Sequence, residues 1–274
     1  MVSFADPRFS RAARAALAAF LGLFAGSAHA AITVSVGPPL IETVARPRST
    51  IRDIITFRNS GTEPLVVSVS FSDFGVDEAG EVTFEKPPGT LPSSVLPYIR
   101  VSPLRIRVQP GEQVFFRYTI KLPDHDFKQL RAVVFFAGEP DIERTGNQVV
   151  FVPRMGVPLY VESTEAKPAQ LQIDEVKWAR SPETNNTITL SMLVHNSGER
   201  NSRPTGTVVV RSADGAFEKT FPFNQGREGV LPGQKRNWKT SFGPVPEGDL
   251  SINFRMATSF RDTFASSYHV PAAH

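Results

Sequence analysis

The sequence predicts an all-β protein with two immunoglobulin-like β-sandwich domains in tandem, after an N-terminal signal peptide. Three observations support this prediction. Apolar and polar residues alternate with period two in many short segments, turns rich in Pro, Gly and Asn separate those segments, and the same two turn motifs occur once in each half of the chain. The 23 prolines and 19 glycines follow no three-residue period, which excludes a collagen-like chain.

Residues 1–30 have the features of a secretory signal peptide. Three arginines precede the apolar segment Ala15–Gly26, which is too short to span a bilayer, and Ala28–Ala30 fits a cleavage site before Ala31. Cleavage removes three of 30 basic residues and one of 27 acidic residues, which leaves a formal charge of +1. This near-neutral chain argues against nucleic-acid binding, and no later apolar run is long enough for a transmembrane helix.

The chain contains no cysteine. This excludes disulfide frameworks, thiolate metal sites, iron–sulfur clusters, cysteine nucleophiles and a lipoprotein anchor. An exported two-domain chain without cysteine fits a bacterial periplasm, with secretion or the cell surface as the alternative. The sequence leaves the oligomeric state open.

The first predicted domain covers residues 31–163. Alternation is clearest where Val114, Phe116 and Tyr118 share one face while Phe115 and Arg117 share the other. About seven strands at this spacing are typical of an immunoglobulin-like sandwich. The predicted strands are residues 32–36, 51–57, 65–74, 99–101, 104–108, 114–120, 131–137 and 149–152.

Residues 164–169 form a polar, proline-containing predicted linker, and residues 170–274 form the second domain. An Asn-Ser-Gly motif occurs at 59–61 and again at 196–198, and each is followed by a Pro-Gly turn. We interpret the repeat as two copies of one fold, although unrelated sandwiches could also reuse these turns. The predicted strands here are residues 187–194, 205–211, 217–223, 250–256 and 264–270.

The sequence indicates no catalytic, cofactor-binding or metal-binding residues. His125 lies among acidic neighbours but has no second histidine nearby, so a surface turn is favoured over a metal ligand. Asp73 and Asp77 could serve a glycosidase or a calcium site, yet their spacing fits a solvated hairpin better. No G-x-S-x-G motif is present, so we expect a non-enzymatic protein without a cofactor.

Basic residues alternate along two successive predicted strands. Arg105 and Arg107 share a face of one strand, and Arg117 and Lys121 share a face of the next, with Arg100 nearby. If these strands pair across the Pro-Gly turn between them, the four residues form one basic surface for an anionic polymer. The alternative is the ordinary polar outer face of an antiparallel sheet.

The apolar segment that ends the first domain is a candidate binding edge. It contains Val149, Val150, Phe151 and Val152, and Arg154 follows one proline later. A hydrophobic edge strand can pair with a strand of another chain. The alternative is a last strand buried by its own sandwich, and the two interpretations are compatible.

The chain contains, in this order, the short motifs Pro38-Pro39, Phe57–Gly61, Val101–Pro103, Gln109–Gly111 and Leu122-Pro123. They resemble those of the PapD-like periplasmic chaperone superfamily, over most of the mature chain. Through Lys121–Pro123, Phe135-Phe136 and Val157–Tyr160 the chain is also similar to WxL-interacting two-domain surface proteins.

The resemblance implies a partner and a mechanism. In pilus chaperones the final strand of the first domain pairs with a pilin subunit that lacks a strand, and two basic residues hold the subunit's C-terminal carboxylate. Carried over, Val149–Val152 would be the donor strand and Arg154 one basic residue. The second should lie near Leu40–Thr43, where this chain has Ile41 and Glu42.

We therefore expect an exported protein-binding module, a chaperone for a surface or fimbrial subunit that acts by β-strand addition. The missing second anchor, with Arg46 and Arg48 lying just beyond the expected position, separates the chain from pilus chaperones in this respect. The alternative is a cell-surface scaffold or adhesin that binds cell-wall polymer.

Overall fold

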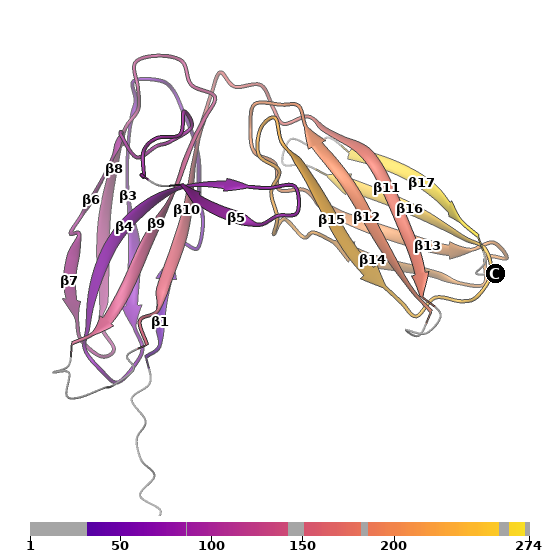
Figure 1. The fold of residues 1–274 in the computed structure, drawn as a ribbon, viewed down its shortest axis with the longest axis horizontal. Coiled ribbons are helices and arrows are strands. Elements are labelled where there is room, and N and C mark those ends of the chain that lie inside the picture. The colour runs from indigo at the N-terminus through magenta and orange to yellow at the C-terminus, as the bar shows by residue number, and fades with distance from the viewer. Residues whose placement is uncertain (1–31, 86, 142–150, 182–185, 258–262, 272–274) are drawn as a thin grey trace, which may run out of the picture.

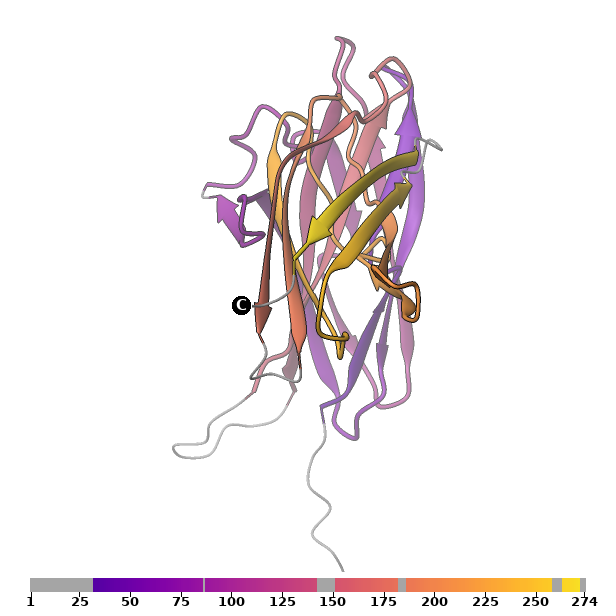
Figure 2. The same ribbon diagram turned by 90° about the vertical axis from the view of Figure 1, so that its right-hand side faces the viewer.

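The computed structural model describes residues 32–271 except 86, 142–150, 182–185 and 258–262. Every regular element in these residues is a β-strand, which confirms the predicted fold class. The strands form two sandwiches that meet at an angle (Figures 1 and 2). The predicted signal peptide lies outside the described residues, and no helix in the described part is long and apolar enough to cross a membrane.

The first sandwich packs a four-stranded sheet against a six-stranded one. One sheet has the order β1 (Val34–Gly37), β3 (Thr50–Asn59), β8 (Gln113–Lys121), β6 (Ile99–Ser102). The other has the order β2 (Ile41–Ala45), β10 (Arg154–Ser163), β9 (Gln129–Pro140), β4 (Leu65–Val76), β5 (Val82–Glu85), with β7 (Arg105–Val108) also on β4.

Aromatic rings from both sheets fill the first core. Phe57, Phe116 and Phe136 are completely buried, and the centroids of the last two rings lie 4.9 Å apart. Val114 and Tyr118 are buried with Phe116 on one face of β8, as the alternation predicted.

The second sandwich packs a three-stranded sheet against a four-stranded one. Its core is also apolar, with Ile188, Leu190 and Phe254 buried between the sheets. The orders are β11 (Leu171–Ser181), β12 (Thr187–Asn196), β15 (Lys235–Phe242), and β14 (Glu218–Phe223), β13 (Thr205–Ser212), β16 (Leu250–Ala257), β17 (Thr263–Val270).

The Asn-Ser-Gly motif of the first sandwich binds its own Pro-Gly turn. The Asn59 amide donates to the carbonyl of Val108 at 3.3 Å, and its side-chain oxygen accepts from the Gly61 N–H at 3.0 Å. The Asn59 carbonyl accepts from the Gly111 N–H at 2.8 Å. Two turns that are distant in sequence are therefore held together by one buried asparagine.

The second sandwich repeats these contacts. The Asn196 amide donates to the Val230 carbonyl at 3.0 Å, and its side-chain oxygen accepts from the Gly198 N–H at 3.0 Å. The Asn196 carbonyl accepts from the Gly233 N–H at 2.8 Å. This agreement supports the interpretation of the repeated motifs as two copies of one fold.

The condition for a four-residue basic surface, pairing of the two strands across the Pro-Gly turn, is not met. β7 does not pair with β8 across the Pro-Gly turn. It pairs with β4 in the other sheet, so Arg105 and Arg107 lie on a different sheet from Arg117 and Lys121. The turn connects the two sheets of the sandwich instead of closing a hairpin, because its hydrogen bond to Asn59 holds it at the end of β3.

The final strand of the first sandwich begins later than predicted. β10 starts at Arg154, Phe151 and Val152 precede it outside any strand, and residues 149–150 lie outside the described residues. The apolar run Val149–Val152 placed the predicted strand too far towards the N-terminus. β10 tolerates Pro158 because the N–H that proline lacks would point away from β9, so no hydrogen bond between β9 and β10 is lost.

The two sandwiches touch on both sides of the β10–β11 connection. The Asn201 N–H donates to the Glu162 carboxylate at 2.7 Å. The β4–β5 hairpin extends from the first sandwich towards the second, where the Glu78 carbonyl accepts from the Asn237 N–H of β15 at 2.7 Å (Figure 1). These contacts enclose a cleft between the sandwiches.

Candidate functional site

Half of β10 has a neighbouring strand on only one side. β9 pairs with β10 from Arg154 to Glu162, whereas β2 pairs only with Leu159–Ser163. The segment Arg154–Pro158 therefore forms an open edge in the described part of the sheet, and this segment is called the open half of β10 below.

The backbone of the open half presents hydrogen-bonding groups to the open side. The Gly138 N–H of β9 donates to the Pro153 carbonyl at 3.1 Å. Residues along an antiparallel strand alternate between bonding to their neighbour and pointing away from it. The odd-numbered residues of β10 therefore bond to β9, while Arg154 and Gly156 direct their N–H and C=O groups to the open side.

Apolar side chains accompany these backbone groups. Val157 and Leu159 are buried in the first core, and Met155, which lies on the same face, is 37% exposed. Phe151, just before the strand, is 72% exposed, and Val152 is also exposed. An open edge with exposed apolar side chains favours pairing with another chain.

Arg154 lies on the outer face of the sheet, beside the open edge. Its guanidinium carbon lies 3.7 Å from the centroid of the Phe135 ring, and one guanidinium nitrogen donates to the Ser70 hydroxyl at 3.4 Å. A Cβ on Gly156 would come within 2.9 Å of the same ring. Phe135 thus occupies the space beside the strand, and Gly156 leaves room for it.

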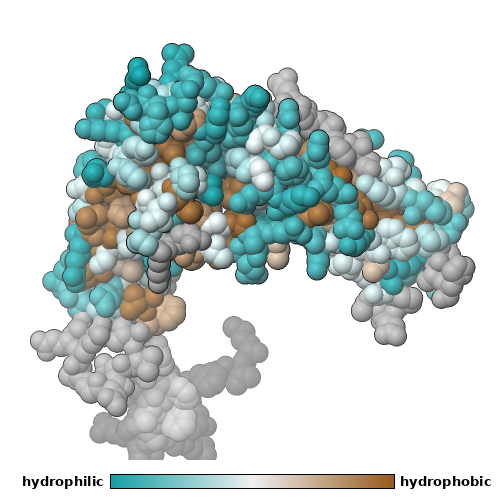
Figure 3. Space-filling model, turned by 45° about the horizontal axis from the view of Figure 1, so that its top comes forward, coloured by the Kyte–Doolittle hydropathy of each residue, from teal (hydrophilic) through white to brown (hydrophobic). Residues whose placement is uncertain are grey.

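This outer face continues into the cleft between the sandwiches, whose volume is about 460 Å³. Its first-domain wall is aromatic: Phe74 packs edge-on against Tyr160 at 5.6 Å, and Phe84 packs edge-on against Phe135 at 5.3 Å. Leu231 of the second sandwich joins this cluster. Figure 3 shows apolar surface on this side of the first sandwich and at the junction.

The cations of the cleft come from the second sandwich. Arg203 donates to Glu42 at 2.7 Å, and Arg236 lies 3.0 Å from Glu228. Arg227 also lines the cleft; it is exposed and forms no ion pair among the described residues. Arg227 is therefore the cation of the cleft that is available to an incoming anion.

The second basic anchor implied by the resemblance is not at its expected position. Ile41 is buried in the first core, and the Glu42 carboxylate pairs with the second sandwich. Of the two nearby arginines, Arg48 donates to the Asp124 carbonyl at 3.2 Å. The start of β2 thus carries an acid that joins the sandwiches.

Burial changes the acidity of two groups at the junction. It raises the pKa of Tyr160, which the nearby Arg203 partly offsets. It also raises the pKa of Glu162, while hydrogen bonds from Asn201 and Gln129 act in the opposite direction. Both groups lie where the sandwiches meet, so their ionisation is linked to the junction.

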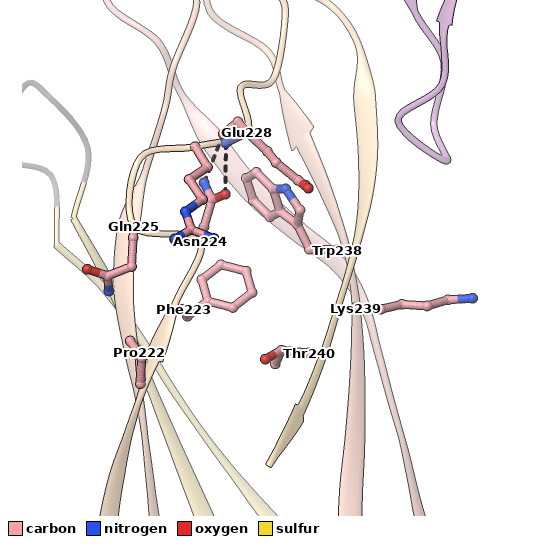
Figure 4. Close-up of a pocket in the computed structure, with 9 residues that line it drawn as sticks. Pro222, Phe223, Asn224, Gln225, Glu228, Trp238, Lys239 and Thr240 are labelled. Carbon is pink, nitrogen blue, oxygen red and sulfur yellow. Dashed lines mark hydrogen bonds between the residues drawn. The ribbon is translucent and has the colours of Figure 1, made fainter. Parts of the chain in front are cut away.

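A smaller cavity of about 300 Å³ lies between β14 and β15 (Figure 4). The Phe223 and Trp238 rings, which pack edge-on at 5.5 Å, line it, and Asn224 joins Glu228 through two hydrogen bonds across its upper end. The Trp238 indole N–H is buried without a partner in the described residues. The sequence did not indicate this cavity, because no motif marks Trp238 or its neighbours.

The candidate acidic residues have structural roles. Asp73 accepts hydrogen bonds from the N–H groups of Gly89, Thr90 and Leu91 at 2.8 to 3.2 Å and so holds their loop against β4. Asp77 accepts from the N–H groups within its own turn. Among the described residues no three His, Asp or Glu side chains gather as a metal site would require.

No protein-family model matches the chain, and no curated protein matches it. Several solved structures do. One is the CsuC–CsuE chaperone–tip adhesion subunit pre-assembly complex of Acinetobacter baumannii, with a TM-score of 0.43, 16% identity, and coverage of 75% of this chain and 89% of the other.

Two further matches are also chaperones. The Escherichia coli chaperone DraB has a TM-score of 0.44 and 15% identity over 87% of this chain and 98% of its own. The SafB chaperone of Salmonella enterica, in complex with the SafA pilin, has a TM-score of 0.45 and 14% identity over 88% of this chain and 97% of its own. These chaperones are the kind of protein that the sequence resemblance named, but at such low scores the function must be argued from the chain's own residues.

Proposed function

We propose that the chain is an exported chaperone that captures a surface or fimbrial subunit by adding a strand of that subunit to the open half of β10. The single observation that carries the proposal is the pattern of strand pairing along β10. β2 stops pairing at Leu159, which leaves the backbone of Arg154 and Gly156 without a strand partner among the described residues.

Main-chain hydrogen bonds would supply affinity, and alternating side chains would supply selectivity. Arg154 and Gly156 each offer one N–H and one C=O to an incoming strand. Met155, Val152 and Phe151 offer exposed apolar surface at the same end of the sandwich. A subunit that lacks a strand of its own would fill its core with these side chains.

The cleft would receive the end of the captured segment. Its aromatic wall suits an apolar side chain, and Arg227 suits a carboxylate. The guanidinium of Arg154, the first residue of the open half, lies over the ring of Phe135, which also lines the cleft. The capture site would therefore run from Phe151 along β10 into the cleft, in the periplasm or at the cell surface.

The rival function, a scaffold or adhesin that binds cell-wall polymer, rested on four basic residues sharing one surface. The pairing of β7 with β4 separates them. Arg107 is also engaged with Asp141, at 2.7 Å. Strand addition is thus the function that the geometry supports best.

The test separates the backbone of Arg154 from its side chain. Arg154→Ala removes the guanidinium and keeps the N–H, whereas Arg154→Pro removes both. Proline is tolerated at the first residue of an edge strand whose N–H faces outward, so both variants should fold. The tagged protein is used to capture exported proteins from a periplasmic extract, and the captured proteins are identified by mass spectrometry.

We expect capture of a β-rich subunit that is short of one strand. Arg154→Ala should keep most of the capture and Arg154→Pro should lose most of it, with both melting temperatures close to that of the parent. Equal capture by the two variants would contradict main-chain pairing at this edge.

A further inference from the structure

The outer face of the sheet β1-β3-β8-β6 points away from the cleft and takes no part in the proposed capture. Side chains alternate between the two faces of each strand, so the residues between the buried ones point outward. The outward residues of the two central strands are Thr50, Arg52, Ile54, Thr56 and Arg58 on β3, and Gln113, Phe115, Arg117, Thr119 and Lys121 on β8.

Five of the outward residues of this sheet are cations. They are Arg52, Arg58, Arg117, Lys121 and, on β6, Arg100, and all are exposed. None of them forms an ion pair with another described residue, and the outward positions of the four strands contain no Asp or Glu. These five residues are called the basic face.

Four of the five cations lie close together across the ladder. Arg52 and Arg100 both pair with Thr119 from opposite sides, and Arg117 and Lys121 flank that threonine along β8. Like charges at such diagonal positions repel one another unless an anion lies between them. A face with this arrangement is therefore suited to an anionic partner.

The basic face carries five positive charges and no acid at its outward positions, whereas the chain without its predicted signal peptide has a formal charge of only +1. A face with charges of one sign orients a protein towards an anionic surface before contact.

Two large apolar side chains protrude among the cations. Phe115 is 47% exposed and Ile54 is 41% exposed, and Ile54 lies directly opposite Arg117 in the ladder. An apolar groove of about 500 Å³ borders the face at β6, where Leu104 is exposed and Arg100 forms part of the rim. The face thus combines cations with apolar groups, as membrane-surface segments do.

We propose that the basic face docks the protein on a lipid surface that carries anionic, phosphate-bearing headgroups. A soluble polyanion would satisfy the cations but would leave Ile54 and Phe115 in water. A protein partner would need acids at fixed positions opposite five long side chains, whereas lipid headgroups move laterally to meet them. A lipid surface therefore satisfies both the charges and the apolar groups.

Docking in this way leaves the open half of β10 accessible. β10 belongs to the other sheet of the sandwich, and its outer face, with Arg154 and Phe135, points in the opposite direction from the basic face. The protein could therefore hold a captured partner while its basic face lies on the lipid.

Vesicle flotation tests the proposal with the exported chain. The probes are vesicles of phosphatidylcholine alone and of equal parts phosphatidylcholine and phosphatidylglycerol, at about 0.1 M salt, where the Debye length is about 10 Å. We expect binding only to the anionic vesicles, with loss of binding at high salt.

Two triple variants with the same change in net charge locate the contact. Arg52→Gln, Arg117→Gln and Lys121→Gln together should weaken binding to the anionic vesicles by roughly tenfold or more. The matched control, Lys219→Gln, Lys239→Gln and Arg255→Gln, removes three exposed cations of the second sandwich and should change binding by less than about twofold. Phe115→Ser should weaken binding several-fold, and all three proteins should melt near the parent temperature.

Three results would overturn the proposal. Equal losses in the two triple variants would show that net charge alone drives binding. Wild-type binding to soluble polyphosphate but not to anionic vesicles would assign the face to a polymer. If the wild-type protein binds neither polyphosphate nor anionic vesicles but retains an exported protein through these same cations, the basic face would be assigned to a protein partner.

Discussion

The last strands of the two sandwiches differ in what protects their edges. In the described residues β17 pairs only with β16, so its other edge is open, yet that strand carries polar residues such as Ser267 and His269. β10 is covered by β2 along Leu159–Ser163 and open before it, where the nearby exposed side chains include Phe151 and Met155. An unpaired edge is common to both, and β10 combines it with exposed apolar groups at Phe151 and Met155.

The difference begins at the first strand of each sandwich. The break at Gly37–Pro39 divides the first segment, so that β1 pairs with β3 and β2 crosses to pair with β10. β11 has no such break and stays with β12 along its length. The prolines at the start of the first sandwich therefore determine how much of its last strand is covered.

The largest expected effect concerns the cores that support these strands. Phe116→Ala should lower the free energy of unfolding of the first sandwich by about 3–5 kcal/mol, because Phe116 is completely buried against Phe136. Phe115→Ala, on the opposite face of β8, should cost less than about 1 kcal/mol. Urea titration measures both, and similar losses would show that the two faces had been assigned wrongly.

The next effect tests whether the hydrogen bonds of Asn59 and Asn196 contribute equally to the stability of their sandwiches. Asn59→Ala and Asn196→Ala each remove a side chain that donates to carbonyls and accepts from a glycine N–H. Each should cost about 2–3 kcal/mol, since buried backbone groups lose their partners. Urea titration followed by a probe in each sandwich should show similar losses, and a cost in only one sandwich would contradict the equivalence.

A smaller effect concerns the two edges. Met155→Asp places a charge on the open half of β10 and should weaken partner capture by at least about tenfold, because the charge cannot enter an apolar groove. Ser267→Asp, on β17, is the matched control and should leave capture unchanged. Both residues are exposed in part, so the melting temperatures should stay near the parent value. The opposite pattern would move the binding edge to the second sandwich.

The smallest effect concerns the junction. The pKa of Glu162 is raised by burial, so the folded protein holds its proton more readily than the unfolded chain does. Linkage then requires stability to fall as pH rises from the usual carboxyl value of 4.5 through the raised pKa. Glu162→Gln should lack this loss. The check is the difference in urea midpoint between variant and parent, which should grow as pH rises through that interval.

Local pattern predicted most of the strands but not their partners. Alternation identified the buried face of β8, where Val114, Phe116 and Tyr118 are buried, because side-chain direction is set within one strand. The pairing of β7 with β4 could not be predicted, since it depends on a connection between sheets. The strands β2, β5 and β15 were not predicted; in β15, for example, Trp238 and Phe242 are the only apolar residues, so the sequence shows no regular alternation.

The site stays a proposal. The apolar run Val149–Val152 and Arg154 drew attention to the end of the first sandwich, whereas the open half of β10 depends on where β2 stops, which the local sequence does not show. The cations of the cleft come from the second sandwich, far away in sequence, so spacing alone could not connect Arg203 with Glu42.

Amide hydrogen exchange at β10 tests the central claim most directly. In the free protein the N–H groups of Arg154 and Gly156 should exchange rapidly, while those of Met155 and Val157, directed at β9, should be protected. In the complex with the captured subunit, Arg154 and Gly156 should become protected by at least about tenfold, as new ladder hydrogen bonds require. Unchanged exchange at both residues in the complex, or new protection at β17 instead, would contradict strand addition at the open half of β10.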